Sequence, residues 1–157
     1  TEASVSLREI SRSPEMFEKT YSMAEKRGVD IQHILYDADE VTALLQKFDK
    51  GEIPEQNRRA IFVLGRYAQN QQSSIADLTA FLDSMGDNQL RWSVCAFGQA
   101  EHDCLFAALE LGGHARIGFE NNYLAPDGQV FDSNGASVAA FVDRAAKAGF
   151  SPVRGAL

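Results

Sequence analysis

Three side chains that could bind a ligand or a metal ion, those of His114, Arg116 and Glu120, are separated by even numbers of residues near the carboxyl end of the chain. Alternate side chains of an extended strand lie on one face, so these three would point to the same side. Parallel strands covered by helices are ordinarily apolar on both faces, and burying an unpaired charge is costly. Two interpretations therefore stay open. Arg116 and Glu120 form a structural ion pair, with each other or with a neighbouring strand, or they meet a metal ion or a ligand.

Other polar side chains follow apolar runs, which is where ligands bind in parallel α/β sheets, at the carboxyl ends of the strands. The residues in such positions are Arg8, Glu9, Asp37, Arg66, Gln99, Glu101, His102, Glu120, Asn121 and Asn122. Glu101, His102 and Asp103 stand where a helix is expected to begin. Acidic residues favour the first turn of a helix, so a solvated helix start is the expectation there rather than a catalytic cluster.

Further reactive residue types have simpler interpretations. His33 lies within an apolar strand and is expected to be a core histidine with satisfied hydrogen bonds. Cys95 and Cys104 show no metal-ligand spacing, so we expect them to be packing residues.

The elements that position these residues alternate between two patterns. Short apolar runs rich in β-branched or aromatic residues predict strands, and stretches with apolar residues at helical spacing predict helices. The predicted strands are Ala3–Ile10, Ile31–Tyr36, Ala60–Leu64, Trp92–Phe97 and His114–Phe119. Ser13, Ser74 with Asp77, and Asn134 are expected to cap helices, and Gly28, Gly51, Gly86, Gly112 and Gly149 to end them.

Strand followed by helix, repeated five times, is typical of right-handed βαβ units in a parallel sheet. No linker or low-complexity segment divides the 157 residues, so 1–157 is expected to be a single domain of the α/β class. Five strands fit an open doubly wound sheet. They also fit part of a (β/α)8 barrel, which needs about 250 residues to close.

Composition excludes several classes of partner. The net charge of −7 argues against nucleic acid, because phosphate binding requires clustered Lys and Arg. No apolar run approaches the roughly 18 residues that span a bilayer, and no signal peptide opens the chain, so no membrane partner is expected. Two cysteines are too few for a disulfide scaffold. These features together predict a cytoplasmic protein with reduced thiols.

The segment Gly112–Asn122 reads GGHARIGFENN, and this element resembles the β-keto acid cleavage enzymes, whose type member cleaves 3-keto-5-aminohexanoate. The resemblance extends over nearly the whole chain. It also includes the segments Val5–Glu9, Ile34–Asp37, Phe62–Gly65, Trp92–Gly98 and Asp127–Asn134.

This resemblance implies a zinc-dependent TIM barrel that converts a β-keto acid and acetyl-CoA into acetoacetate and a new acyl-CoA. It implies that Glu120 is a Zn²⁺ ligand and that Arg116 binds or polarises the substrate. Asn121 stands where the type member has an aspartate base. An amide cannot take up a proton, so Asn121 is expected to orient the substrate. Glu9, Arg66 and Asn122 are expected to contact the substrate as well.

The family's zinc site also uses a His-x-His pair from the second barrel strand. This sequence has three histidines and no such pair. We therefore expect the chain to be the carboxyl-terminal portion of the barrel, about strands four to eight, with an incomplete zinc site and an activity that needs the amino-terminal strands.

Two alternatives remain. A truncated, non-catalytic barrel would expose two unpaired edge strands and self-associate into a homo-oligomer. An independent open-sheet protein would bind its ligand near Glu9, Asp37 and Arg66 and would have helices on both faces of the sheet.

Overall fold

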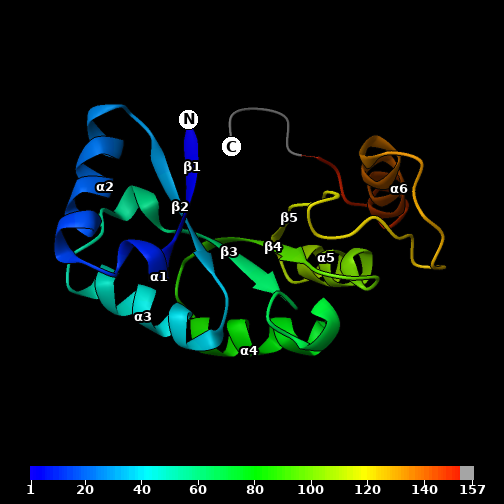
Figure 1. Ribbon diagram of the computed structural model, residues 1–157, viewed down its shortest axis with the longest axis horizontal. Coiled ribbons are helices and arrows are strands. Elements are labelled where there is room, and N and C mark those ends of the chain that lie inside the picture. The colour runs from blue at the N-terminus through cyan, green and yellow to red at the C-terminus, as the bar shows by residue number, and fades with distance from the viewer. Residues whose placement is uncertain (153–157) are drawn as a thin grey trace.

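A computed structural model describes residues 1–152 as one parallel sheet with five strands in the order β1-β2-β3-β4-β5 (Figure 1). Each strand pairs in parallel with the next, and the sheet does not close within the described residues. The strands are β1 (Glu2–Ser6), β2 (Asp30–Leu35), β3 (Arg59–Leu64), β4 (Arg91–Ala96) and β5 (His114–Ala115). The predicted α/β parallel architecture is confirmed, and it is consistent with a partial (β/α)8 barrel.

Helices occupy the connections, largely where the capping signals predict them. Ser13 Oγ accepts from Met16 N, and Ser74 with Asp77 forms the expected capping box. For the last helix the cap is Ser133 rather than Asn134, whose side chain instead accepts from Phe119 N. The helices are α1 (Leu7–Ile10), α2 (Pro14–Lys26), α3 (Ala38–Asp49), α4 (Ile75–Met85), α5 (Glu101–Glu110) and α6 (Asn134–Lys147), with short 3₁₀ turns at Glu55–Asn57 and Gln69–Gln71.

The two faces of the sheet differ sharply. One face packs against helices through a large apolar core that includes Ile31, Phe62 and Val94. The opposite face carries a small cluster of strand and strand-end residues, with Ile61, Val63, Cys95 and Phe97 at its centre. A sequential strand order with right-handed crossovers places the intervening helices on one side, as Figure 1 shows for α2 to α5. This arrangement is that of a barrel wall, with an outer and an inner face, and it contradicts a doubly wound sheet.

Two predicted strands are shorter than the sequence pattern suggests. The run Ala3–Ile10 leaves the sheet after Ser6, and Leu7–Ile10 forms α1. The run His114–Phe119 keeps strand geometry only at His114 and Ala115. Arg116 N still donates to Val94 O at 2.8 Å, but the chain then turns away. Leaving the sheet keeps the charged side chains that follow in contact with solvent, which avoids the desolvation that a longer strand would impose.

His33 is a fully buried polar residue on the helix-covered face of the sheet. Tyr21 Oη lies 2.7 Å from its Nε2, and its Nδ1 lies 2.8 Å from the carbonyl oxygen of Arg59. The carbonyl can only accept, so Nδ1 carries the proton and Tyr21 donates to Nε2. Burial lowers the pKa of His33 to about 4. His33 is the satisfied core histidine that the sequence predicts.

Trp92 anchors the junction between β4 and β5. Its ring stacks on Phe62, which stacks in turn on Phe81. A Cβ atom added at Gly113 would lie 2.2 Å from the Trp92 ring. The second glycine of the pair before β5 is therefore required by close packing against this indole.

Cys95 and Cys104 are buried free thiols, as expected for packing residues. Burial raises the pKa of Cys95 to about 11. Among residues 1–152, no helix combines the length and the apolar character needed to cross a bilayer.

Candidate functional site

The candidate site lies on a tight turn, Gly118–Asn122, that follows β5. Asn121 N donates to Gly118 O at 2.9 Å, closing the turn. Gly98 N, at the carboxyl end of β4, donates to Asn121 O at 3.3 Å, and Phe119 N donates to Asn134 Oδ1 at 2.9 Å. The turn is therefore held to the end of one strand and to the start of α6.

Arg116 and Glu120 form an ion pair across this turn. Their side chains are 48% and 67% exposed, respectively, so the pair lies at the surface rather than inside the sheet. Arg116 and Glu120 pair with each other, which is one of the two interpretations that the sequence left open. Because both side chains are exposed, the pair avoids the free-energy cost of burying charge. Solvent-exposed ion pairs contribute little stability, so both side chains can change partner when an anion or a cation arrives.

The two asparagines that follow Glu120 are buried and differ in their contacts. The Asn122 side chain donates to Leu124 O at 2.6 Å and accepts from Leu124 N at 2.9 Å, so its amide is engaged within the loop. Asn121 is bonded through its backbone N and O. Its side chain has no hydrogen bond to another residue in the described part of the chain. Its amide atoms are nevertheless not among the fully buried polar atoms that lack a partner.

Glu101 is a member of this neighbourhood that the sequence interpretation missed. A solvated first helical turn was expected there, but Glu101 is fully buried and its neighbour His102 is nearly so. The Glu101 carboxylate accepts from Gly118 N and from Asn122 Nδ2, each at 3.4 Å. Burial raises the pKa of Glu101 to about 7. The missed signal is the apolar spacing of α5, which continues back through Glu101 and His102 when the helix is extended to its first residue.

His102 serves the packing between α5 and α6. Its Nε2 lies 3.1 Å from Ser137 Oγ, and its ring stacks on Phe131 and meets Phe141 edge-on. Burial lowers the pKa of His102. This histidine ties the last helix to α5, and its contacts lie outside the Gly118–Asn122 turn.

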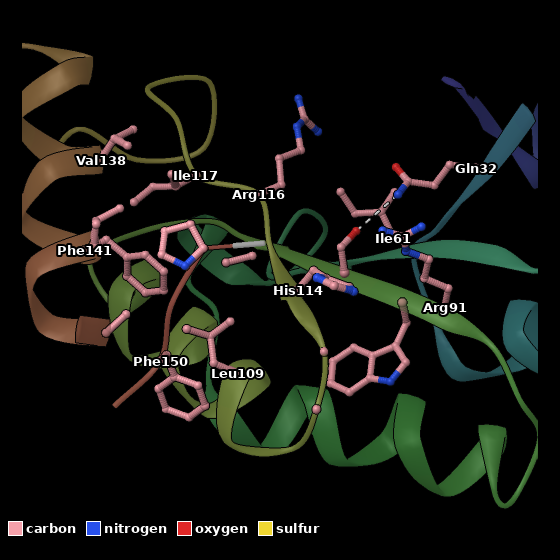
Figure 2. A pocket seen from close by; sticks show the side chains of 18 of the residues that line it. Gln32, Ile61, Arg91, Leu109, His114, Arg116, Ile117, Val138, Phe141 and Phe150 are labelled. Carbon is pink, nitrogen blue, oxygen red and sulfur yellow. Dashed lines mark hydrogen bonds between the residues drawn. The ribbon is translucent and has the colours of Figure 1, made fainter. Parts of the chain in front are cut away.

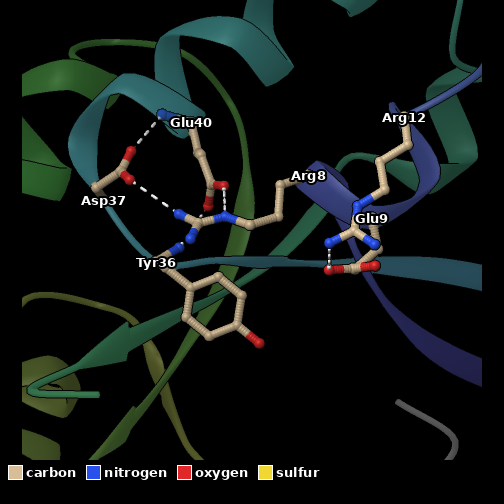
Figure 3. A network of polar contacts seen from close by, with 6 residues as sticks. All are labelled: Arg8, Glu9, Arg12, Tyr36, Asp37 and Glu40. Carbon is tan, nitrogen blue, oxygen red and sulfur yellow. Dashed lines mark hydrogen bonds and ion pairs between the residues drawn. The ribbon is translucent and has the colours of Figure 1, made fainter. Parts of the chain in front are cut away.

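Glu9 lies apart from the turn, beyond the end of β1. It pairs with Arg12 at 2.6 Å and is exposed (Figure 3). Its neighbour Arg8 points the other way, to Asp37 at 3.0 Å and to Glu40 at 2.5 Å, with the ring of Tyr36 at 4.8 Å. Arg8 and its two acids thus join the carboxyl ends of β1 and β2 in a structural network.

Arg66 follows β3 and is exposed. Its guanidinium lies 5.1 Å from the centre of the Phe97 ring, which follows β4. Arg66 and the Gly118–Asn122 turn therefore share the carboxyl edge of the sheet, as the strand-end rule predicts. Glu9 shares this edge as well, but its carboxylate is engaged by Arg12.

A cavity of about 670 Å³ lies beside β5 (Figure 2). Strand residues of the inner face, among them Gln32 and Arg91, form one wall, and apolar side chains of α6 such as Val138 and Phe141 form the other. Arg116 lines this cavity, whereas Glu120 does not. The cavity extends along the inner face toward the amino-terminal ends of β1, β3 and β4, where Glu2, Arg59 and Arg91 line it, so only Arg116 of the predicted ligand-binding pair borders it.

The donor set around Glu120 does not make a zinc site within the described residues. Zinc takes about four ligands, of which at least three come from protein. Among residues 1–152, no group of three His, Cys, Asp or Glu side chains is placed to hold a metal ion. Glu120 alone does not fit the group that the family resemblance implies.

The chain matches a known protein family. The search of curated proteins found no match to the chain. The model of the family described as "beta-keto acid cleavage enzyme" matches residues 4–156. That match covers nearly the full sequence, including the turn and the strand ends described above. The chain therefore belongs to the beta-keto acid cleavage enzyme family.

Proposed function

We propose that this chain supplies the carboxyl-terminal part of the active site of an enzyme that exchanges acyl groups between a β-keto acid and acetyl-CoA. Family membership indicates an enzyme of the β-keto acid cleavage type. The observation that carries the finer proposal is the Arg116–Glu120 pair, which stands exposed near the carboxyl edge of the sheet, with Arg116 also bordering a cavity on the inner face.

The reaction proposed is a balanced exchange. The carbon that bears the substrate carboxylate gives up a proton and bonds to the acetyl carbonyl carbon of acetyl-CoA, and the thioester bond breaks to release the CoA thiolate. The thiolate then attacks the original keto carbon, the bond between the two carbons breaks, and the carboxylate-bearing carbon takes back a proton. The released acyl group ends on the CoA sulfur, and the other product is acetoacetate.

Arg116 is the residue proposed to bind the substrate. Its guanidinium forms charge-assisted hydrogen bonds to the carboxylate or keto oxygen once Glu120 is drawn away. Asn121 orients the bound substrate through its amide and moves no proton. Arg66 lies on the same edge and adds positive charge for an anionic substrate or for CoA phosphates, and Asn122 supports the turn.

Zn²⁺ enters the proposal only as a metal ion to which this chain would contribute one ligand. In a complete barrel the metal would supply Lewis-acid stabilisation of negative charge on a substrate oxygen. Glu120 would be the ligand from this chain, and the remaining ligands would come from outside residues 1–152.

The open sheet supports the interpretation of the chain as the carboxyl-terminal portion of the barrel. β1 and β5 each pair on one side within the described residues. The cavity beside β5 lies between the inner face and α6, where a further strand of a barrel would pack. We therefore expect full activity to require additional barrel strands.

The test begins with the chain as it is. Acetoacetate is titrated into isotopically labelled protein while the Arg116 side-chain NH signals and the backbone amides of 116–122 are followed. We expect saturable shifts there and none in Arg116→Gln. Thioester exchange is then measured by mass spectrometry with acetyl-CoA and a panel of β-keto acids, on this chain and on a version extended by the amino-terminal strands of a family member. Exchange that is insensitive to Arg116→Gln would contradict the proposal.

A second candidate function follows from the same open edges. An unpaired strand edge invites pairing with another copy, so a non-catalytic, self-associating half-barrel is the alternative. Sedimentation analysis separates the two, since a monomer that melts cooperatively and binds acetoacetate at Arg116 supports the enzymatic proposal.

A further inference from the structure

Glu101 combines full burial with the absence of a counter-ion. None of its accessible surface remains, and the described part of the chain places no cation against its carboxylate. Buried carboxylates are ordinarily paired or multiply hydrogen-bonded, because desolvating the charge is costly. The role of Glu101 is therefore to be sought in the two hydrogen bonds that its carboxylate accepts.

The two contacts of Glu101 stand on either side of the candidate ligand Glu120. Gly118 N, two residues before it, donates to Oε1, and Asn122 Nδ2, two residues after it, donates to Oε2. One carboxylate thus spans both ends of the turn. Glu101 N also donates to Gly98 O at 3.0 Å, which fixes Glu101 to the end of β4.

The exposed Arg116–Glu120 ion pair crosses the turn itself, and two neutral contacts tie the turn to the rest of the fold. They are the Gly98–Asn121 and Phe119–Asn134 hydrogen bonds. Each fixes one point of the turn, whereas the Glu101 carboxylate fixes two. Removing it would leave the middle of the turn attached to β4 and α6, while the two ends would keep the hydrogen bond between Asn122 N and Gly118 O and the bonds of the Asn122 side chain to Leu124.

We infer that Glu101 is a positioning residue: its buried carboxylate holds both ends of the Gly118–Asn122 turn and so sets the direction of the Glu120 carboxylate and the Asn121 amide. The inference rests on the proposed function only in giving Glu120 and Asn121 a role toward metal and substrate. The mechanical role of Glu101 is testable without any activity.

The surroundings of Glu101 make this contact sensitive to protonation. Its pKa is raised to about 7 by burial, opposed by the hydrogen bonds from Gly118 and Asn122. The pKa of Cys95 on β4 is influenced by Arg116 and Glu120, on the segment after β5, and also by Glu101. His102 follows Glu101 on α5 but bonds to Ser137 on α6. An ionised carboxylate accepts from both donors, whereas a protonated one must offer a donor of its own to one of them.

Backbone hydrogen exchange on the full chain, followed by NMR at pH 7.5 and corrected for intrinsic rates, tests the inference. We expect Glu101→Ala to speed exchange of the Gly118 amide about tenfold, with smaller increases at Asn121, while β3 amides such as Ile61 keep their rates. Glu101→Gln keeps one acceptor and should restore most of the protection. Glu110→Gln removes an exposed carboxylate from the same helix and should change nothing in the turn.

A second measurement keeps the inference testable if Glu101→Ala fails to fold. In the unmodified chain, the Gly118 amide proton shift should follow a single titration with a midpoint near 7, and Glu101→Gln should abolish it. Equal acceleration in the turn and in β3 would show a general loss of stability and overturn the inference. A Gly118 shift that titrates unchanged in Glu101→Gln would overturn it as well. Failure of acetoacetate binding with these results intact would count against the proposed function alone.

Discussion

His33 and Glu101 are both buried ionisable residues, yet the regions around them hold them in opposite ways. His33, under the helices, has two short partners at 2.7 and 2.8 Å, each of the right donor or acceptor type. Glu101, behind the Gly118–Asn122 turn, has two long contacts at 3.4 Å. The hydrogen bonds around His33 stabilise one conformation of the folded chain, because a fully satisfied neutral network in the core is rigid. The region around Glu101 retains a charge that costs stability, which is typical of sites that serve function.

The largest expected effect contrasts the two faces of the sheet. Phe62 is fully buried between Phe81 and Trp92, so Phe62→Ala should lower the free energy of unfolding by about 3–5 kcal/mol. Phe97 belongs to the small cluster on the inner face, and Phe97→Ala should cost clearly less. Urea unfolding at pH 7 measures both. Equal losses would mean that the inner face is as tightly packed as the helix-covered one.

His33 should give the next largest effect, as a dependence of stability on pH. Its pKa is about 4 in the folded chain and about 6.5 when unfolded, so between these values the unfolded state binds more protons. Stability is complete above pH 6.5 and falls by roughly 3 kcal/mol as the pH drops to 4. His33→Gln should remove this slope in a series of urea titrations. His114→Gln, at a half-exposed position, should leave it in place.

Glu101 should contribute a slope of opposite sign. Its folded pKa of about 7 exceeds the unfolded value of about 4.5, so stability is greatest below pH 4.5 and declines as the pH rises through 7. We expect about 2 kcal/mol, less than the full shift implies, because the turn can open and hydrate the carboxylate. Glu101→Gln should therefore be more stable than the parent at pH 8. Glu110→Gln is the matched control, and a parent-like loss between pH 4.5 and 7 in Glu101→Gln would contradict the assignment.

The smallest effect belongs to the candidate site itself. Glu120→Gln and Arg116→Gln should each change the free energy of unfolding by less than about 1 kcal/mol, since the pair is exposed. Acetoacetate binding, by contrast, should be lost in Arg116→Gln. A large loss of stability in either variant would make the pair structural and would erase the contrast between the two regions.

The sequence predicts the fold better than it predicts the site. Helix caps at Ser13 and Ser74 and alternating strand and helix patterns are local signals, and the structure bears them out. The ends of β1 and β5 depend instead on where a charged side chain can remain hydrated, which the apolar pattern of a single segment does not reveal. For the same reason, the sequence could not decide whether Arg116 and Glu120 form an ion pair or meet a metal ion or a ligand.

Glu101 shows most clearly where sequence reasoning stops. An acid in the first turn of a helix is ordinarily solvated, and the local pattern favours that interpretation. Its burial arises because a turn 17 residues further along folds over it. Only the tertiary arrangement of β4, α5 and that turn reveals the contact.

Trp92 gives this molecule a built-in optical probe. It is the single tryptophan of the chain, and its indole touches Gly113 where β5 begins while stacking on Phe62 in the core. If β5 detached from β4, one edge of the indole would meet water, and its fluorescence would shift to longer wavelength before the helices unfolded. Peeling of the outermost strand can therefore be followed in real time without any attached dye.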